Sequence, residues 1–316
     1  AMTAQVRLHQ ASRFCERLSS AQGEGAVEAA FAEFLSDPAV SEFRLLAGNG
    51  QRRSVALRRA FRAQLGPLYE NAKLWKHCLN KPCGYAGDYI ALEHFYDQRP
   101  HDDTTGPWTF VDLWATKTTL ARAFKARKDV LRSWLEEEAW GRDRFRICAL
   151  GSGSARELRE IPLPRLSQVS ATLVDGDRKA LWYARQHLEG RARSLGLVDD
   201  DVARDGDVPG ALGGARFEAI YAAGMFDYMA DDAAVEVGRK FGDLLADDGH
   251  FVFSLTDARR FDAWFYDLFL DWKWVKRTVD DGPALAQKMG LKVVRALQVE
   301  GGAQGVFVCQ KACERE

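Results

Sequence analysis

One stretch of this sequence, Phe145 to Glu157, limits the possible folds more than any other. It begins as an apolar run, passes through a turn of small residues that includes Gly151 and Gly153, and continues as a charged segment typical of a helix start. This pattern predicts a strand that ends in a ligand-binding loop, because glycines let the backbone approach a ligand where a Cβ atom would collide. The free N–H groups at the start of the helix point into the same space. An ordinary tight turn between a strand and a helix is the alternative interpretation.

A carboxylate follows at the spacing that a nucleoside ligand requires. The run Ala171 to Asp177 has the pattern of a second strand, and Asp175 lies 22 positions after Gly153. In doubly wound sheets an acidic residue at this place hydrogen-bonds the ribose hydroxyls of the ligand. We therefore predict that Asp175 binds a ribose and that Asp177 caps the next helix.

The charge of the chain argues against a polyanionic partner. Its 316 residues include 44 Lys and Arg and 45 Asp and Glu, which gives a net charge of -1 at pH 7. This balance provides neither the basic surface that binds a nucleic-acid backbone nor a polybasic membrane anchor. We expect a small-molecule ligand, no nucleic-acid partner and no insertion into a membrane, while the oligomeric state stays open.

The cysteines and the N-terminus bear on the cellular compartment. The 6 cysteines form no C-x-x-C pair and no cysteine and histidine cluster with zinc-finger spacing, which predicts reduced thiols and no metal site. The N-terminus has no cationic flank followed by an apolar region, and no segment reaches about 18 uninterrupted apolar residues. We expect an unexported, cytoplasmic protein.

The first part of the chain, residues 1–141, has helical periodicity. Apolar residues such as Phe31, Phe34 and Leu35 recur at helical spacing, while Arg and Glu occupy the other positions. Lys117 to Trp140 forms the longest helical stretch and leads into the second part. We expect an all-helical N-terminal domain over residues 1–141, followed by a second domain over residues 142–316.

A short loop, Lys81 to Tyr89, interrupts the helical part and contains two glycines. Asp88 is well placed to cap the helix that begins at Tyr89, which would make its role structural. Aromatic residues beside flexible glycines also suit a lid over a ligand. We predict that Tyr85, Asp88 and Tyr89 close the site, with the helix cap as the alternative.

Strands and helices alternate from Phe145 onward. A helix is expected from Arg178 to Leu195, and a third strand is expected to close at Gly206 to Val208. Within that strand end, Asp207 is a candidate acceptor for an adenine amino group. The fourth strand, Phe217 to Ala222, runs into a second glycine-containing loop, which should share a rim with the first.

The C-terminal part predicts an antiparallel end to the sheet. His250 to Leu255 has the pattern of a fifth strand, and a short turn joins two last apolar strands, Leu291 to Val299 and Gly305 to Gln310. The aromatic residues between Thr256 and Asp281 should be mostly helical core. The expected fold is α/β, with a Rossmann-like, mostly parallel sheet that ends in an antiparallel hairpin.

The residue after the glycine turn distinguishes between nucleoside ligands. The dinucleotide fingerprint G-x-G-x-x-G/A needs a small third residue for close packing of helix and strand, and Arg156 occupies that place here. No G-K-[ST] follows the glycines, which excludes a phosphate loop. A dehydrogenase-like dinucleotide enzyme is therefore disfavoured but stays as an alternative.

Several of these motifs resemble a known family. Leu150 to Gly153, Leu173 to Asp175 and Phe217 to Tyr221 are similar to the general pattern of class I S-adenosylmethionine (SAM)-dependent methyltransferases, as is the terminal hairpin. Three further segments resemble the bacterial family of 3-hydroxypalmitic acid methyl ester biosynthesis proteins, which methylate a fatty-acid carboxylate: Gly84 to Tyr89, Ala223 to Tyr228 and Asp271 to Thr278. The resemblance implies SAM as the cofactor and a small-molecule acceptor.

The sequence departs from this family in two places. Glu218 stands where the fourth strand usually has Asp, and the segment before Asp207 is untypical. These departures weaken the predicted contact between Asp207 and the adenine amino group.

The predicted site residues fall into two groups. The backbone of Gly151 and Gly153 is expected to bind the amino-acid part of SAM. The complete set of predicted cofactor-binding residues is Gly151, Ser152, Gly153, Ser154, Asp175, Gly176, Asp207, Val208, Gly224, Met225 and Phe226. The predicted catalytic residues are Tyr85, Asp88, Tyr89, Asp227 and Arg277.

The acceptor decides whether a base is needed. A carboxylate is ionised at neutral pH and needs none, whereas an alcohol or a protonated amine does. The expected rim loops contain no histidine, which favours a carboxylate; Asp88 and Asp227 are the candidate bases otherwise. Arg277 either pairs with the acceptor carboxylate or forms a structural ion pair. An amino-acid-like or specialised-metabolite acceptor and a non-catalytic cofactor-binding protein are the remaining alternatives.

Overall fold

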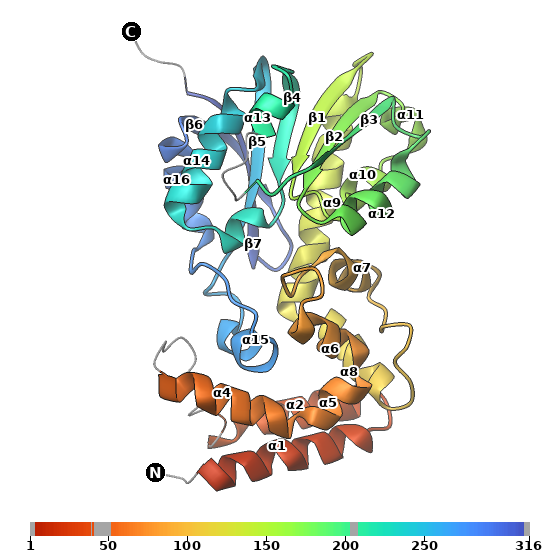
Figure 1. Ribbon diagram of the computed structural model, residues 1–316, viewed down its shortest axis with the longest axis vertical. Coiled ribbons are helices and arrows are strands. Elements are labelled where there is room, and N and C mark those ends of the chain that lie inside the picture. Colours follow the sequence, from red (N-terminus) through yellow and green to blue (C-terminus); the bar gives the residue numbers. More distant parts are fainter. Residues whose placement is uncertain (1–3, 39, 41–51, 203–207, 313–316) are drawn as a thin grey trace. The chain divides into compact units, whose positions relative to one another are not determined.

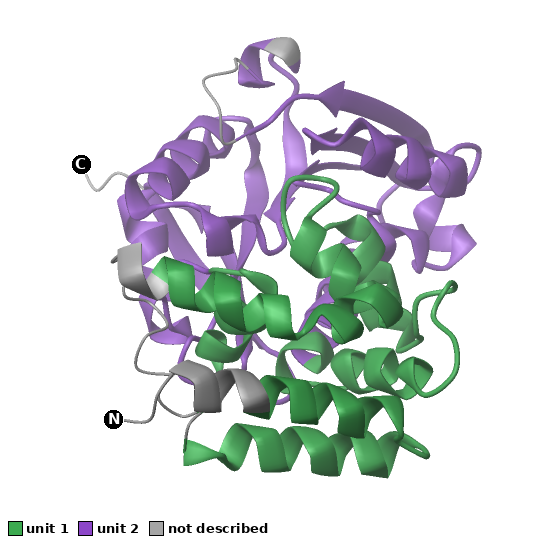
Figure 2. Ribbon diagram, turned by 60° about the horizontal axis from the view of Figure 1, so that its bottom comes forward, with its two compact units in different colours: residues 1–122, 262–273 green, residues 123–261, 274–316 purple. Residues whose placement is uncertain are grey.

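The computed structural model describes residues 4–38, 40, 52–202 and 208–312. The chain divides into two compact units, shown in Figure 2: residues 1–122 with 262–273 form unit 1, and residues 123–261 with 274–316 form unit 2. Within the described residues, no helix is both long and apolar enough to cross a membrane.

Unit 1 is helical, as the periodicity predicts. Its helices are α1 (Ala4–Ser19), α2 (Glu24–Ser36), α4 (Arg52–Gln64), α5 (Gly66–Asn71), α6 (Lys73–Asn80), α7 (Tyr89–Asp97), α8 (Trp108–Thr116), the start of α9 (Thr119–Ala139) and α15 (Ala263–Leu270). Aromatic rings form much of its core. The ring of Phe269 lies 5.5 Å from that of Phe61 and 5.7 Å from that of Trp75, so the aromatic segment after the fifth strand is mostly helical core, as expected.

The boundary between the units differs from the expected division at residue 141. Unit 2 begins within α9, because Leu131, Leu135 and Ala139 of that helix belong to the core beneath the sheet. The segment 262–273 belongs to unit 1, because the aromatic side chains of α15 pack there. The longest helical stretch thus ends in the second unit and does not complete the first.

Unit 2 contains a seven-stranded sheet with the order β3-β2-β1-β4-β5-β7-β6 (Figure 1). The strands are β1 (Phe145–Leu150), β2 (Val169–Asp175), β3 (Ser194–Asp199), β4 (Phe217–Ala222), β5 (Leu245–Thr256), β6 (Leu291–Gln298) and β7 (Gln304–Lys311). Neighbouring strands from β3 to β5 are parallel, and β7 is antiparallel to both β5 and β6. The predicted mostly parallel sheet with a terminal antiparallel hairpin is confirmed.

Helices cover both faces of this sheet. They are α10 (Arg156–Arg159), α11 (Leu163–Leu166), α12 (Arg178–Leu188), α13 (Val208–Ala211), η1 (Met225–Tyr228), α14 (Asp231–Gly242), η2 (Val279–Asp281) and α16 (Gly282–Lys288). Alternate residues of the central strand enter two separate cores: Ile147 and Ala149 pack with α9, α10 and α12, while Cys148 and Leu150 pack with α14 and α16. Burial on both faces explains why the parallel strands are continuous apolar runs.

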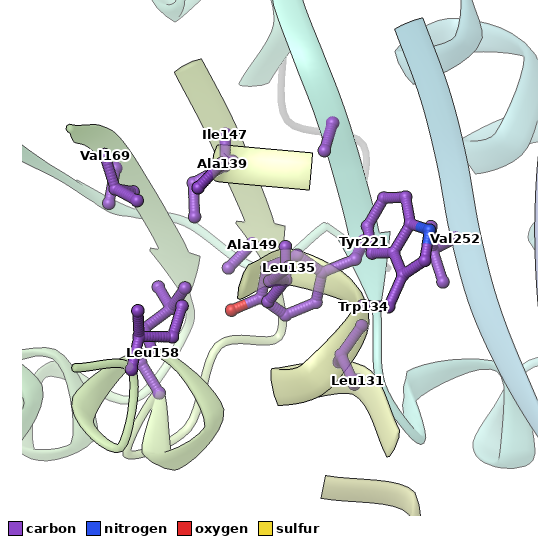
Figure 3. Packing of buried hydrophobic residues seen from close by; sticks show 14 of the residues in the cluster. Leu131, Trp134, Leu135, Ala139, Ile147, Ala149, Leu158, Val169, Tyr221 and Val252 are labelled. Atoms are coloured by element: carbon purple, nitrogen blue, oxygen red, sulfur yellow. The ribbon is translucent and has the colours of Figure 1, made fainter. Parts of the chain in front are cut away.

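Figure 3 shows the core on the α9 side. Leu131, Trp134 and Leu135 of α9 pack against β1 and against Tyr221 of β4. This apolar layer holds β1 and β4 at the centre of the sheet. The loops that follow these two strands are consequently fixed at their bases.

The third strand differs from the prediction. Helix α12 ends at Leu188, well before the expected Leu195, and β3 is formed by Ser194–Asp199. Val208 begins the short helix α13, while Gly206 and Asp207 lie outside the described residues. As an edge strand, β3 is largely exposed and has no apolar alternation that would mark it in the sequence. β5 also begins earlier than expected, at Leu245, with a register irregularity opposite β4.

Candidate functional site

The loop after β1 has an unusual backbone conformation. Gly151, Gly153 and Ala155 all have positive φ angles, at 59°, 52° and 49°. Glycine adopts such angles at little cost, and left-handed residues within a turn direct successive N–H groups into a concave surface. The loop leads directly into α10. Three of its N–H groups already donate within the protein: Ser152 to the Val174 carbonyl at 3.1 Å, Gly153 to Asp175 at 2.7 Å and Ala155 to the Ser152 carbonyl at 2.8 Å.

Asp175 fixes this loop to the end of β2. One carboxylate oxygen accepts the Gly153 N–H at 2.7 Å and the other accepts the Asp177 N–H at 2.8 Å. Burial raises the pKa of Asp175, while both N–H bonds act in the opposite direction. Asp177 in turn caps α12 by accepting the Lys179 N–H at 2.9 Å, as predicted. Asp175 therefore shapes the loop. Its contact with a ribose stays a prediction.

The loop also contains a polar side chain that has no protein partner. Ser152 is 8% exposed, and its Oγ atom makes no hydrogen bond within the part of the chain that the structure describes. A buried hydroxyl without a partner costs free energy, so a ligand that completes its hydrogen bonds would be favoured there. The residues of this loop therefore fit the polar amino-acid end of SAM.

The loop after β4 adjoins the loop after β1. A Cβ atom placed on Gly151 would lie 3.5 Å from the Met225 sulfur, and Gly224 has a φ of 88°. In Figure 1, β1 and β4 are central neighbours; the chain runs from β1 to β2 and β3 on one side and continues from β4 on the other. Such a change of direction creates the crevice where doubly wound sheets bind ligands. The structure thus brings the predicted Gly151, Gly153, Gly224 and Met225 together.

Asp227 is buried and fully engaged. Its carboxylate accepts the Thr256 N–H at 2.8 Å and the Thr256 hydroxyl at 2.6 Å, and Gln304 donates to that hydroxyl at 2.9 Å. Burial raises the pKa of Asp227, whereas the two Thr256 bonds and the charges of Arg127 and Arg277 lower it. Both carboxylate oxygens hold the chain in place, which leaves Asp227 poorly suited to remove a proton from an acceptor.

Arg277 holds the loop after β4 from the other side. Its guanidinium donates to the Phe226 carbonyl at 2.5 Å and the Met229 carbonyl at 2.7 Å, and it forms an ion pair with Asp231 at 2.7 Å. Of the two predicted arrangements for Arg277, the structure shows the structural ion pair. Arg277 is 5% exposed, and these partners use its donors.

The remaining predicted residues of unit 2 lie in different surroundings. The Phe226 ring is fully buried against Phe253, with ring centroids 5.6 Å apart, so it supports the loop from the core. Gly176 is exposed, and Val208 is buried in α13. Glu218, the departure from the family pattern, forms an ion pair with Arg146 at 2.5 Å.

The loop before α7 in unit 1 has a clear structural role. Asp88 caps α7 by accepting the Ala91 N–H at 3.0 Å, and it is 2.7 Å from the His77 ring nitrogen. The predicted helix cap is confirmed. Tyr85 and Tyr89 are half-buried, and their catalytic roles stay predictions.

Sequence reasoning missed Arg127 of α9. Its side chain is almost fully buried, and a Cβ atom placed on Gly224 would lie 2.6 Å from its Nη1 atom. Arg127 lies four residues before Leu131 and three after Phe124, on the apolar side of the helix. This position on the apolar side indicates burial, but α9 has so many charged residues that Arg127 does not differ from them in the sequence.

Comparison with known proteins supports the fold. No family model matches the sequence, and the search of curated proteins found no match. A possible exported protein from Bordetella parapertussis is similar in structure along both chains, with 15% sequence identity, a TM-score of 0.60 and coverage of 99% of this chain and 98% of that one. Magnesium protoporphyrin IX methyltransferase from Synechocystis PCC 6803, solved with bound S-adenosylhomocysteine (SAH), has 11% identity and a TM-score of 0.50. The match covers 70% of this chain and 92% of that one. The chain has the class I methyltransferase fold, as predicted.

Proposed function

We propose that this protein is a SAM-dependent methyltransferase that acts on a small molecule, with a carboxylate as the favoured acceptor. The observation that carries the proposal is the loop after β1, with three alternate residues at positive φ, a carboxylate anchor at Asp175 and an unpartnered hydroxyl at Ser152. It lies at the crevice where this type of sheet binds its ligands. The similar fold of a methyltransferase solved with bound SAH supports the same cofactor.

The residues of the two loops have distinct proposed roles. The backbone from Gly151 to Ser154 and the Ser152 hydroxyl would hold the amino-acid end of the cofactor, Asp175 the ribose, and Met225 would lie alongside. The bound cofactor supplies a methyl group that its positive sulfur already activates. The chain then has to align the acceptor and exclude water, and such positioning can supply about 7–11 kcal/mol in favourable cases.

The preference for a carboxylate rests on the state of the candidate bases. Asp227 accepts two hydrogen bonds from Thr256. Asp88 contacts the His77 ring nitrogen and accepts the Ala91 N–H at the start of α7. Glu157, another buried carboxylate of unit 2, is also engaged, since it accepts the Tyr221 hydroxyl at 2.6 Å. An acceptor that is already ionised needs none of these groups. A fatty-acid-like acid, which the family resemblance implies, is one acceptor of this class.

A methyl-transfer assay tests the acceptor class. The protein would be incubated with methyl-labelled SAM and matched series of carboxylic acids, alcohols and amines, including 3-hydroxypalmitic acid. The proposal predicts labelled methyl esters and little label in the other series. Transfer only to alcohols or amines would reject the carboxylate, and SAH binding without transfer to any acceptor would favour a non-catalytic protein. In the same assay, unchanged turnover of Tyr85→Phe and Tyr89→Phe would remove the proposed catalytic roles of these residues.

We also propose a cytoplasmic location. Cys78, Cys148 and Cys309 are free thiols buried in the structure, which is in keeping with a reducing compartment. Cell fractionation checks this, and recovery of the protein outside the cytoplasm would contradict it.

A further inference from the structure

Arg127 is a buried cation beside the loop after β4. Its side chain is 3% exposed, its guanidinium packs on Gly224, and its Cζ atom lies 5.3 Å from the centre of the Phe124 ring. The close approach to Gly224 exists because that residue has no Cβ atom. The guanidinium therefore lies directly beside the backbone of the loop after β4.

This guanidinium has no hydrogen-bond or ion-pair partner in the described part of the chain. The contact of Arg127 that is observed there is the one with the Phe124 ring. The next residue, Lys128, is also buried but forms ion pairs with Asp129 and Glu160. A buried charge without hydrogen bonds is costly, so most such groups in proteins have partners.

Two buried carboxylates, Glu157 and Asp227, attract the positive charge of Arg127 but form no hydrogen bond or ion pair with it in the described structure. Glu157 and Asp227 are close enough for the charge of Arg127 to lower their pKa values, against the opposing and larger effect of burial. Both carboxylates already accept hydrogen bonds, Glu157 from Tyr221 and Asp227 from Thr256. The five N–H donors of the guanidinium thus remain for another oxygen ligand.

A second buried polar group, in the loop after β1, also has no partner among the described residues. The buried Ser152 hydroxyl has no partner in the described structure, and its loop contacts the loop that carries Gly224 through Gly151 and Met225. Two neighbouring loops therefore each border a buried polar group that lacks a partner. A ligand with several oxygens that reaches both loops would satisfy both groups.

We propose that Arg127 binds a carboxylate of the ligand held at the carboxyl ends of β1 and β4. The inference deepens the proposed function and rests on it. A guanidinium can hold a carboxylate through two parallel hydrogen bonds, a geometry that lysine cannot reproduce. The carboxylate belongs either to the methionine part of SAM or to the acceptor, and the experiment distinguishes these two sources.

The stability of the ligand-free protein is the first measurement. Removal of a guanidinium without hydrogen bonds gives up only its attraction to Glu157 and Asp227 and its contact with the Phe124 ring, so Arg127→Met should unfold at a urea concentration close to that of wild type. A clear loss of stability would assign Arg127 a structural role and overturn the inference. Arg132→Gln is the matched control, because Arg132 lies on the same helix and pairs only with part-exposed Glu136 among the described carboxylates.

Calorimetry with SAH and with 5′-methylthioadenosine, which lacks the amino-acid carboxylate, is the second measurement. If Arg127 binds the cofactor, Arg127→Met should weaken SAH binding roughly 10- to 100-fold and leave methylthioadenosine binding unchanged, with Arg127→Lys in between. If it binds the acceptor, SAH affinity should hold while KM for the acceptor rises by a similar factor. Wild-type affinities and KM in Arg127→Met would overturn the inference, as would equal losses for both nucleosides. Failure of wild type itself to bind SAH would instead reject the proposed function.

Discussion

The loops after β1 and β4 adjoin each other but are held in different ways. The first is shaped by its backbone, with positive φ angles at Gly151 and Gly153 and one carboxylate anchor, and it leaves the Ser152 hydroxyl without a partner in the described structure. The second is fixed by buried side chains, with Asp227 bonded to Thr256 and the Arg277 guanidinium bonded to two carbonyls. The first loop therefore has groups to offer a ligand, while the second forms a rigid wall beside it. Changes around the first should alter binding, and changes around the second should alter stability.

Arg277→Met should have the largest effect on stability. It removes the ion pair with Asp231 and leaves the buried carbonyls of Phe226 and Met229 without a donor, which we expect to cost roughly 3 kcal/mol. Urea unfolding measures the loss. Arg239→Met, at an exposed position of α14, should stay within about 0.5 kcal/mol of wild type. Normal stability of Arg277→Met together with a raised KM for the acceptor would instead support a contact between Arg277 and the substrate.

Asp175→Ala should mainly affect binding. It leaves the Gly153 and Asp177 N–H groups without their acceptor and removes the predicted ribose contact, so SAH affinity should fall at least tenfold, about 1.4 kcal/mol. Calorimetry checks this. The matched control is Asp177→Ala, which loses only the α12 cap and should cost about 1 kcal/mol of stability with nearly normal affinity. Unchanged affinity of Asp175→Ala would remove the ribose assignment.

The contrast between the loops also marks what the sequence could predict. The loop after β1 and the anchor at Asp175 follow from local signals, because a strand buried on both faces is a continuous apolar run and a turn with positive φ favours glycine. The strand Ser194–Asp199 gave no such signal, since it is an exposed edge strand. Arg127 and the partners of Arg277 depend on contacts between residues far apart in the chain. Composition cannot show which of many arginines is buried or paired.

Asp227→Asn tests the electrostatics of the second loop. The pKa of Asp227 in the folded protein is raised above its ordinary value of 3.8, mainly by burial. The stability that this residue contributes is therefore complete below about pH 4 and is lost as the pH rises through the folded pKa. The stability advantage of wild type over Asp227→Asn should decrease with rising pH in urea unfolding.

Asp231→Asn is the control for this pH dependence, and it should show the opposite slope. The hydrogen bond from Arg277 lowers the pKa of Asp231, so its contribution is present above the ordinary pKa and is lost as the pH falls. A pH-independent difference between wild type and Asp227→Asn, with the Asp231→Asn slope as expected, would contradict the burial of an ionisable Asp227.

Ala155→Gly should have the smallest effect. Ala155 has a φ of 49°, which costs an alanine about 1–2 kcal/mol. Glycine removes that cost but increases the conformational entropy of the unfolded chain. We expect a net gain of about 0.5 kcal/mol in unfolding free energy. The counterpart in the second loop, Gly224→Ala, should destabilise, because Gly224 has a φ of 88° and an added Cβ atom would also displace the Arg127 guanidinium. A loss of stability in Ala155→Gly would mean that the buried methyl group outweighs the backbone strain.

The most direct test of the proposed cofactor site is a crystal structure of the protein soaked with SAH. We expect density for the amino-acid part of SAH against the backbone from Gly151 to Ser154, with the ribose hydroxyls at Asp175. SAH bound away from both would contradict the proposed site. So would no density at this place after soaking with saturating SAH, together with density for NAD there after soaking with NAD.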